Sequence, residues 1–293
     1  MAGAVALALG GVAVAAWSGL APVDWGAAAI LHPVRRPVVR RPDRPHETVV
    51  FTSGGARLEG WLIRPAGDPS GFGRALVVYL HGIADNRASG LGAARRLSDQ
   101  GFAVLLFDAR AHGRSTGEAC TYGYHERRDV SAALDAVGAR EAVLLGHSLG
   151  AATALQAAAV DDRVVAVVAA SPFSDLPTIV RERAGWFRLP GRYVEAALSR
   201  AGEMGRFAPQ EASPVGLAPR LRAPVLLLHG AADGKTPPAH SVRIAAALRA
   251  PHELVLLPGV GHDEILGREE AWRAIDAFLA RTRPRSGPTA ASP

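Results

Sequence analysis

The chain of 293 residues contains a single cysteine, Cys120, and a single lysine, Lys235. One cysteine cannot form a disulfide within the chain, and it excludes the cysteine clusters that hold structural zinc. Aromatic residues make up only 6% of the sequence, and no stretch interleaves them with basic residues as nucleic-acid surfaces do. The net charge of +6 comes from arginine, an excess that we attribute to coding composition. We therefore expect no nucleic-acid partner.

Nucleotide-binding patterns are also missing from the sequence. No GxxxxGK occurs, and no GxGxxG follows a first strand, so the chain lacks the usual glycine-rich loops that cradle phosphates. We expect neither an organic cofactor nor a metal. The length and the 48% hydrophobic content are sufficient for one globular domain with extensions.

The first residues form a long uncharged stretch. Residues 2–23 are mostly alanine and glycine, and a helix of that length spans about 33 Å, just enough to cross a bilayer. The arginines between residues 35 and 44 follow this stretch rather than precede it, which favours leaving the rest of the chain in the cytoplasm. We predict an uncleaved transmembrane anchor within residues 1–31. A cleaved signal peptide, with export of the rest, is the alternative.

The anchor is followed by a segment rich in proline and arginine. Residues 32–45 predict an extended linker that lies close to lipid headgroups. The folded domain is expected over residues 46–281. Residues 282–293 have the composition of a disordered tail.

Hydrophobic runs alternate with helical stretches through the folded part. Residues 47–52 and 58–63 flank SGGAR and predict an antiparallel hairpin. Six further apolar runs, each too short for a helix, predict strands at 75–80, 102–107, 141–146, 164–170, 224–230 and 252–259. This pattern is typical of an α/β fold, with a mostly parallel central sheet and helices on both faces. The longer interval 172–222 predicts a small helical lid insertion over the carboxyl ends of the strands.

One motif stands where a strand changes to a helix. The sequence GHSLG at 146–150 follows the run VLLG and precedes an alanine-rich helical stretch. Ser148 therefore lies on a sharp strand-to-helix turn, which strains its backbone and requires small neighbours. Gly146 and Gly150 are those neighbours.

Two other polar residues follow late strands. Asp233 comes after VLLLHGAA, and His262 comes after LVLLPGVG, so the chain order is serine, aspartate, histidine. This is the order of the α/β-hydrolase arrangement. The sequence resembles the α/β-hydrolase superfamily over about residues 47–281, close to its serine-hydrolase branch and to the S9 and S33 peptidases. Supporting motifs are His81-Gly82 after a strand, DARAHGRS at 108–115, and the late loops that carry Asp233 and His262.

The roles of these residues follow from acyl-transfer chemistry. A serine hydroxyl becomes a good nucleophile only when a base takes its proton, and neutral imidazole suits that task, so His262 is the expected base for Ser148. A carboxylate, Asp233, holds the imidazole in the required tautomer. By position, the backbone amides of Ile83 and Leu149 form the oxyanion hole.

Several neighbouring residues have alternative or structural interpretations. Asp175 in SPFSDL also follows a strand and is the alternative acid, although GAADGKTPP matches the usual acid loop better. His81 is interpreted as a structural part of the oxyanion loop, and His147 as a packing or hydrogen-bonding residue. The resemblance assigns Asp108, His112 and Ser115 to a turn that braces the site.

The sequence therefore predicts a serine esterase of α/β-hydrolase fold that forms an acyl-serine intermediate. Serine at the elbow excludes the alkyl-enzyme ester of haloalkane dehalogenases, and the missing HGGG argues against the hormone-sensitive-lipase branch. A serine peptidase or aminopeptidase is one alternative, and a non-catalytic small-molecule-binding member is another. The anchor favours an acyl lipid or acylated protein as substrate, next to small-molecule esters.

Overall fold

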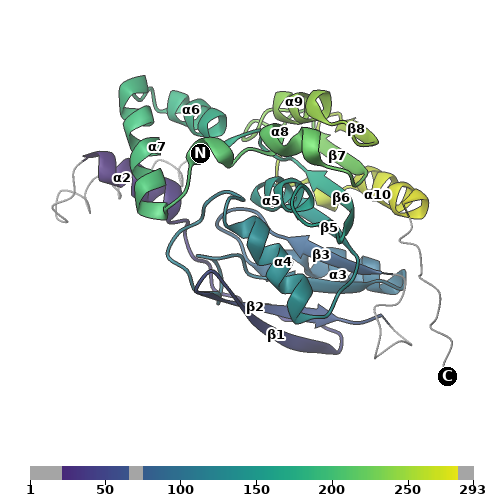
Figure 1. Ribbon diagram of the computed structural model, residues 1–293. Helices are drawn as coiled ribbons and strands as arrows, with labels where there is room; N and C mark the ends of the chain where they lie inside the picture. The colour runs from purple at the N-terminus through teal and green to yellow at the C-terminus, as the bar shows by residue number, and fades with distance from the viewer. Residues whose placement is uncertain (1–21, 66–74, 283–293) are drawn as a thin grey trace.

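The computed structural model describes residues 22–65 and 75–282 (Figure 1). Most of the predicted membrane anchor and nearly all of the predicted C-terminal tail lie outside these residues. Within the two described ranges, no helix is both long enough and apolar enough to cross a membrane.

An eight-stranded sheet forms the centre of the protein, with strand order β1-β2-β4-β3-β5-β6-β7-β8. The first two strands form the predicted hairpin, β2 is antiparallel to β4, and the other neighbours are parallel. All eight predicted strands are confirmed within a few residues. They are β1 (His46–Ser53), β2 (Ala56–Ile63), β3 (Leu76–Leu80), β4 (Ala103–Phe107), β5 (Ala142–His147), β6 (Val164–Ala170), β7 (Val225–Gly230) and β8 (His252–Leu257).

Helices cover both faces of the sheet, as the continuous apolar strands predict. In β4, Leu105 packs into the core on one face and Leu106 into the core on the other, because successive side chains point in opposite directions. The first face is covered by α4 (Glu126–Ala136), α5 (Leu149–Ala158) and α9 (Ala239–Ala247). The opposite face is covered by α3 (Leu91–Asp99) and α10 (Glu269–Arg281). The predicted α/β class is therefore observed.

A helical insertion separates β6 from β7, where the lid was predicted. It contains α6 (Leu176–Trp186), α7 (Gly191–Gly205) and the short α8 (Pro214–Leu217). Asp175 caps α6, because its side chain accepts a hydrogen bond of 2.8 Å from the Thr178 amide. Figure 1 shows α6 and α7 at one end of the molecule, beyond the main sheet.

The first described helix, α2 (Pro22–Leu31), packs on this insertion. A side chain at Gly26 would lie 2.8 Å from Ala197 Cβ, so glycine permits the close approach of α2 to α7. Ala27, Ile30 and Leu31 of α2 are buried in the same apolar cluster as the insertion, and the two helices lie side by side in Figure 1. Residues 22–31, which the sequence analysis assigns to the anchor segment, are therefore part of the folded domain.

The predicted linker runs over the surface of the domain. Arg44 donates to Ser98 Oγ at 2.8 Å and to Asp99 at 2.6 Å, and the Arg35 guanidinium donates to the carbonyl of Ser115. Residues 32–45 contain no helix or strand, as predicted, but these contacts attach them to the domain. The folded unit thus includes residues 22–45, whereas the sequence predicts a folded domain only from residue 46.

Candidate active site

Ser148 lies between β5 and α5 with a strained backbone. Its φ of 53° and ψ of −113° fall outside the backbone conformations that residues other than glycine favour. A Cβ on Gly146 would lie 2.3 Å from the Gly150 carbonyl oxygen, and a Cβ on Gly150 would lie 2.0 Å from that of Leu80. Both positions therefore require glycine, as the sequence analysis predicts for a turn this tight.

The three predicted site residues meet at the carboxyl edge of the sheet. Ser148 Oγ lies 3.0 Å from His262 Nε2, and His262 Nδ1 lies 2.6 Å from Asp233 Oδ2. An ionised carboxylate can only accept, so Nδ1 carries the imidazole proton and the lone pair of Nε2 faces the serine hydroxyl. All three side chains are buried. This is the hydrogen-bond sequence needed to move the serine proton to the imidazole.

Asp233 is held in its ionised form. Its other oxygen, Oδ1, accepts hydrogen bonds from the amides of Lys235 at 2.9 Å and Thr236 at 2.8 Å. Burial would raise the pKa of the Asp233 carboxyl, but the His229 and His262 side chains and the Thr236 amide together lower it well below its ordinary value. The carboxylate is therefore charged near neutral pH and can stabilise a protonated His262.

The alternative acid, Asp175, caps a helix and does not contact His262. Its carboxylate accepts from the Thr178 amide and from Ser174 Oγ, each at 2.8 Å. These contacts occupy it at the N-terminus of α6. In the structure, Asp233 and not Asp175 contacts His262.

The loop after β3 lies beside the serine, as the predicted oxyanion hole requires. A Cβ built on Gly82 would lie 3.6 Å from Ser148 Cβ, and Ile83 lines the same cleft as His262. The Leu149 amide opens α5, where the first N–H groups of a helix have no partner within the helix. The positions of Ile83 and Leu149 are thus compatible with two backbone donors near Ser148.

Buried histidines hold the surrounding loops. His81 Nε2 accepts from the Ala109 amide at 3.0 Å, and His112 Nε2 accepts from the Ala84 amide at 3.2 Å. Burial lowers the pKa of His81, and it lowers the pKa of His112 to about 4, so both rings are neutral and can accept. The structural interpretation of His81 is confirmed.

Asp108 and Ser115 brace the turn that follows β4. Asp108 accepts from the Arg87 amide at 2.7 Å and the Arg114 amide at 2.8 Å. Ser115 Oγ donates to the Asp108 carbonyl at 2.6 Å. With His112, these residues form the bracing turn that the resemblance implies.

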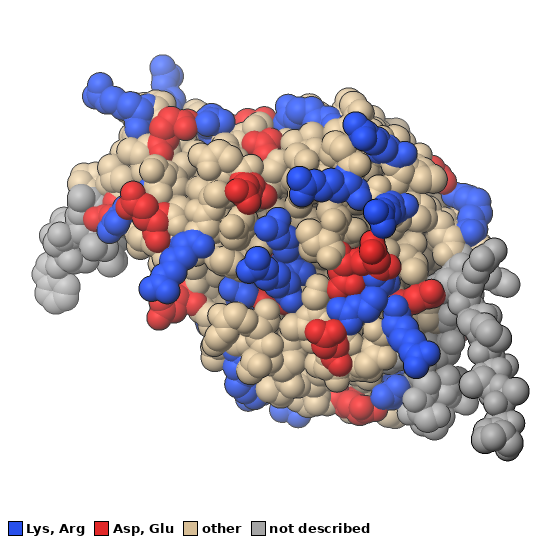
Figure 2. Space-filling model, viewed as in Figure 1, with Lys and Arg blue, Asp and Glu red and all other residues tan. Residues whose placement is uncertain are grey.

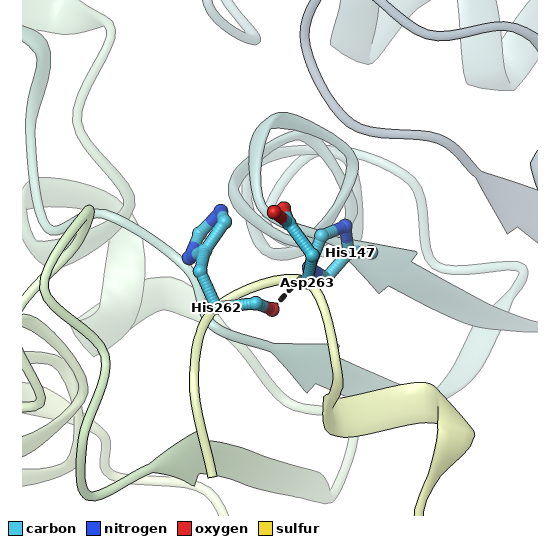
Figure 3. A group of neighbouring side chains, drawn as sticks. All are labelled: His147, His262 and Asp263. Atoms are coloured by element: carbon cyan, nitrogen blue, oxygen red, sulfur yellow. Dashed lines mark hydrogen bonds between the residues drawn. The ribbon is translucent and has the colours of Figure 1, made fainter. Parts of the chain in front are cut away.

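His147 lies beside the base, and Asp263 follows it in the chain. His147 Nε2 donates to the His262 carbonyl at 2.9 Å, and the two rings are 5.0 Å apart. Figure 3 shows the Asp263 carboxylate between the two rings. One donor atom from each of these three side chains lies within 4.8 Å of the others, so the group could hold a metal ion. The hydrogen-bonding interpretation of His147 is confirmed.

A cleft of about 560 Å³ opens next to His262. Its walls include the oxyanion loop, α3 and the charged residues Arg36, Asp85, Arg183, Lys235 and Asp263. These five residues are not among the site residues that the sequence predicts. Arg36 belongs to the predicted linker and Arg183 to the predicted lid, and no motif marks either of them. Only the packing of these segments brings them to the cleft.

The fold and the site together match the architecture of the α/β hydrolases. In these proteins the nucleophilic serine lies on a strand-to-helix turn, next to a histidine–aspartate pair at the carboxyl edge of a mostly parallel sheet. The model of the α/β hydrolase fold family matches residues 75–196. The uncharacterized protein YfhR of Escherichia coli (strain K12) is 30% identical over 244 residues, which cover 80% of this chain and 75% of YfhR. The chain belongs to the α/β hydrolase family.

Two further proteins are similar to the chain. The uncharacterized protein Rv2307c of Mycobacterium tuberculosis (strain ATCC 25618 / H37Rv) is 32% identical over 80% of this chain and 79% of its own. Among solved structures, the Pyrococcus furiosus esterase Pf2001 superposes with a TM-score of 0.71 at 21% identity, covering 87% of this chain and 99% of the esterase. This structural likeness supports the fold.

Proposed function

We propose that the protein is a serine hydrolase that cleaves carboxylic esters or related acyl bonds. The observation that carries this proposal is the continuous contact from Ser148 Oγ through His262 to Asp233, with distances of 3.0 and 2.6 Å. The similarity to an esterase in fold adds support for an ester substrate.

In the proposed mechanism, His262 Nε2 takes the proton of Ser148 while Oγ forms a bond to the acyl carbon. The amides of Ile83 and Leu149 stabilise the negative charge that develops on the acyl oxygen. The bond to the leaving group then breaks, and His262 gives its proton to the departing oxygen. Water, activated by the same nitrogen, attacks the acyl-serine and regenerates Ser148.

Two alternative functions are a serine peptidase and a binding protein, and they differ from an esterase in which substrates, if any, are cleaved. A serine peptidase or aminopeptidase of this fold would use the same three residues, and a binding protein would use none of them. We favour a catalytic protein because the three side chains are aligned for proton transfer, which binding alone does not require.

A panel of soluble substrates tests this proposal. We expect the full-length protein to hydrolyse p-nitrophenyl esters and thioesters, and to release p-nitroaniline from aminoacyl anilides at least about 100-fold more slowly, because amides have the poorer leaving group. Release from anilides at a comparable kcat/KM would favour the peptidase. No turnover of any substrate would favour the binding protein.

We further propose that the protein contacts a membrane, with the hydrolase domain on the cytoplasmic side and an acyl lipid as one substrate. The tip between α6 and α7 supports this proposal. Trp186, Phe187 and Leu189 are 56%, 52% and 43% exposed there, and Arg188 and Arg192 accompany them. Aromatic and basic side chains together suit the interface of an anionic bilayer.

The first described residue, Pro22, lies near this tip. Tyr193, in the first turn of α7, donates to the Pro22 carbonyl at 2.7 Å, and residues 2–21 are uncharged. Figure 2 shows arginine or lysine side chains projecting at the end of the molecule where α6 and α7 lie in Figure 1. The tip therefore lies close to Pro22, the first described residue after this apolar stretch of sequence.

Polar substitution of the tip tests the membrane contact. In the full chain, replacing Trp186 and Phe187 with serine should lower hydrolysis of an ester embedded in anionic vesicles about 10-fold or more, because two large apolar side chains lose their burial in lipid. Hydrolysis of a soluble ester should stay within about two-fold, since neither residue lines the cleft. The matched control replaces Val160 and Val242, 52% and 47% exposed, with serine. Equal losses on both substrates, or none on vesicles, would contradict membrane docking.

A further inference from the structure

The two histidine rings at the cleft each have one nitrogen whose lone pair can bind a cation, and at His262 this nitrogen, Nε2, now accepts from Ser148 Oγ at 3.0 Å. His262 Nδ1 donates to Asp233, so Nε2 keeps its lone pair. His147 Nε2 donates to the His262 carbonyl oxygen at 2.9 Å, so Nδ1 keeps its lone pair. Metal-binding histidines in proteins have this arrangement, in which the second ring nitrogen donates to a carboxylate or a backbone carbonyl.

Asp263 places a carboxylate oxygen near the rings of His147 and His262. Its carboxylate lies between the two rings in Figure 3, and one donor atom from each of the three side chains lies within 4.8 Å of the others. Zinc binds nitrogen and oxygen donors at about 2.0–2.2 Å, which needs donors roughly 3.3–3.6 Å apart. The three donors must therefore come closer together when a cation binds, and the Asp263 side chain, which is 67% exposed, has few packing contacts that oppose this.

The present partner of Asp263 is easily displaced. Lys235 Nζ forms an ion pair with this carboxylate, and both side chains are mostly exposed. Exposed ion pairs contribute little to stability, so a divalent cation can replace the ammonium group.

We infer that His147, His262 and Asp263 form a site for a divalent transition-metal cation such as zinc, and that its occupancy inhibits the enzyme. Two imidazole nitrogens and one carboxylate oxygen form a donor set that zinc accepts, with a water in the fourth position. The bound cation takes the lone pair of His262 Nε2, which therefore can no longer accept the proton of Ser148. The inhibition rests on the proposed hydrolase function, whereas the binding does not.

Direct binding tests the site independently of activity. Zinc affinity is measured on the full-length protein by competition with a chromophoric zinc indicator. We expect the Ser148→Ala variant to bind zinc at least as tightly as wild type, because serine is not a ligand and its hydroxyl competes for Nε2. His147→Gln and Asp263→Asn should each weaken binding about 10-fold or more. His252→Gln and Asp162→Asn, which change exposed residues that do not line the cleft, are the matched controls.

Inhibition is measured with a soluble p-nitrophenyl ester, each variant relative to its own metal-free rate. Zinc should inhibit wild type reversibly, EDTA should restore activity, and Mg²⁺ should have no effect because it prefers oxygen donors. The zinc concentration for half inhibition should rise about 10-fold or more in Asp263→Asn and stay unchanged in Asp162→Asn. Equal zinc affinity in wild type and both ligand variants would overturn the site, whether or not the protein hydrolyses esters. Zinc binding by a protein that turns over no ester would instead leave the site intact and contradict the proposed function.

Discussion

Replacing His262 with glutamine should lower kcat for a soluble ester about 10⁶-fold, the loss found when the base of such a triad is removed. The reason is geometric, because Nε2 is 3.0 Å from Ser148 Oγ and the glutamine amide cannot take a proton at neutral pH. Steady-state kinetics on the purified variant measures the loss, and a thermal unfolding curve checks that the domain is folded.

The matched control for this variant is His252→Gln. His252 opens β8 with an exposed side chain, so its loss should leave kcat within about two-fold. If both variants retain activity near that of wild type, His262 is not the base. In that case the proton transfer proposed above would not be the mechanism.

Replacing Asp233 with asparagine should lower kcat about 10⁴-fold. The asparagine amide can donate to His262 Nδ1, which favours the tautomer whose proton sits on Nε2 and faces the serine. That ring can no longer accept the proton of Ser148. The volume of the side chain is nearly unchanged, so the effect should appear in kcat more than in KM.

Asp175→Asn separates the two carboxylates that follow strands. Asp175 caps α6 through the Thr178 amide, and asparagine caps helices as well as aspartate does. We therefore expect this variant to keep kcat within about two-fold. A large loss in Asp175→Asn, with none in Asp233→Asn, would move the acid to the end of β6.

The strands could be predicted from sequence because each is buried on both faces. In β4, all five residues are buried, so the run FAVLLF has no polar alternation and is too short for a helix. The turn at Ser148 could also be predicted, because only glycine fits at positions 146 and 150 against the backbone of neighbouring segments. In both cases the constraint acts directly on the type of residue at the position, so it is visible in the sequence.

The contribution of residues 22–31 to the domain could not be predicted in the same way. The composition of residues 22–31 continues the apolar stretch before them, yet α2 packs on α7 through Gly26, about 170 positions away in the chain. Nothing near Gly26 in the sequence indicates that Ala197 and Tyr193 will lie against it. Long-range packing of this kind also brings Arg36 to the cleft.

The choice between the two candidate acids could be made only in part from the sequence. Asp175 and Asp233 both follow strands, and the sequence favours Asp233 only because its loop resembles the acid loop of the α/β hydrolases. The structure adds the physical reason, because Asp233 Oδ2 lies 2.6 Å from His262 Nδ1 while the Asp175 carboxylate is occupied at the start of α6.

Covalent labelling of Ser148 by a fluorophosphonate tests the central claim most directly. The reagent reacts with a serine only where a base activates it. Intact mass should show a single adduct, and peptide mapping should place it on Ser148. Labelling should disappear in Ser148→Ala and fall to background in His262→Gln. An adduct on another serine, or labelling of Ser148→Ala at the wild-type rate, would contradict the account.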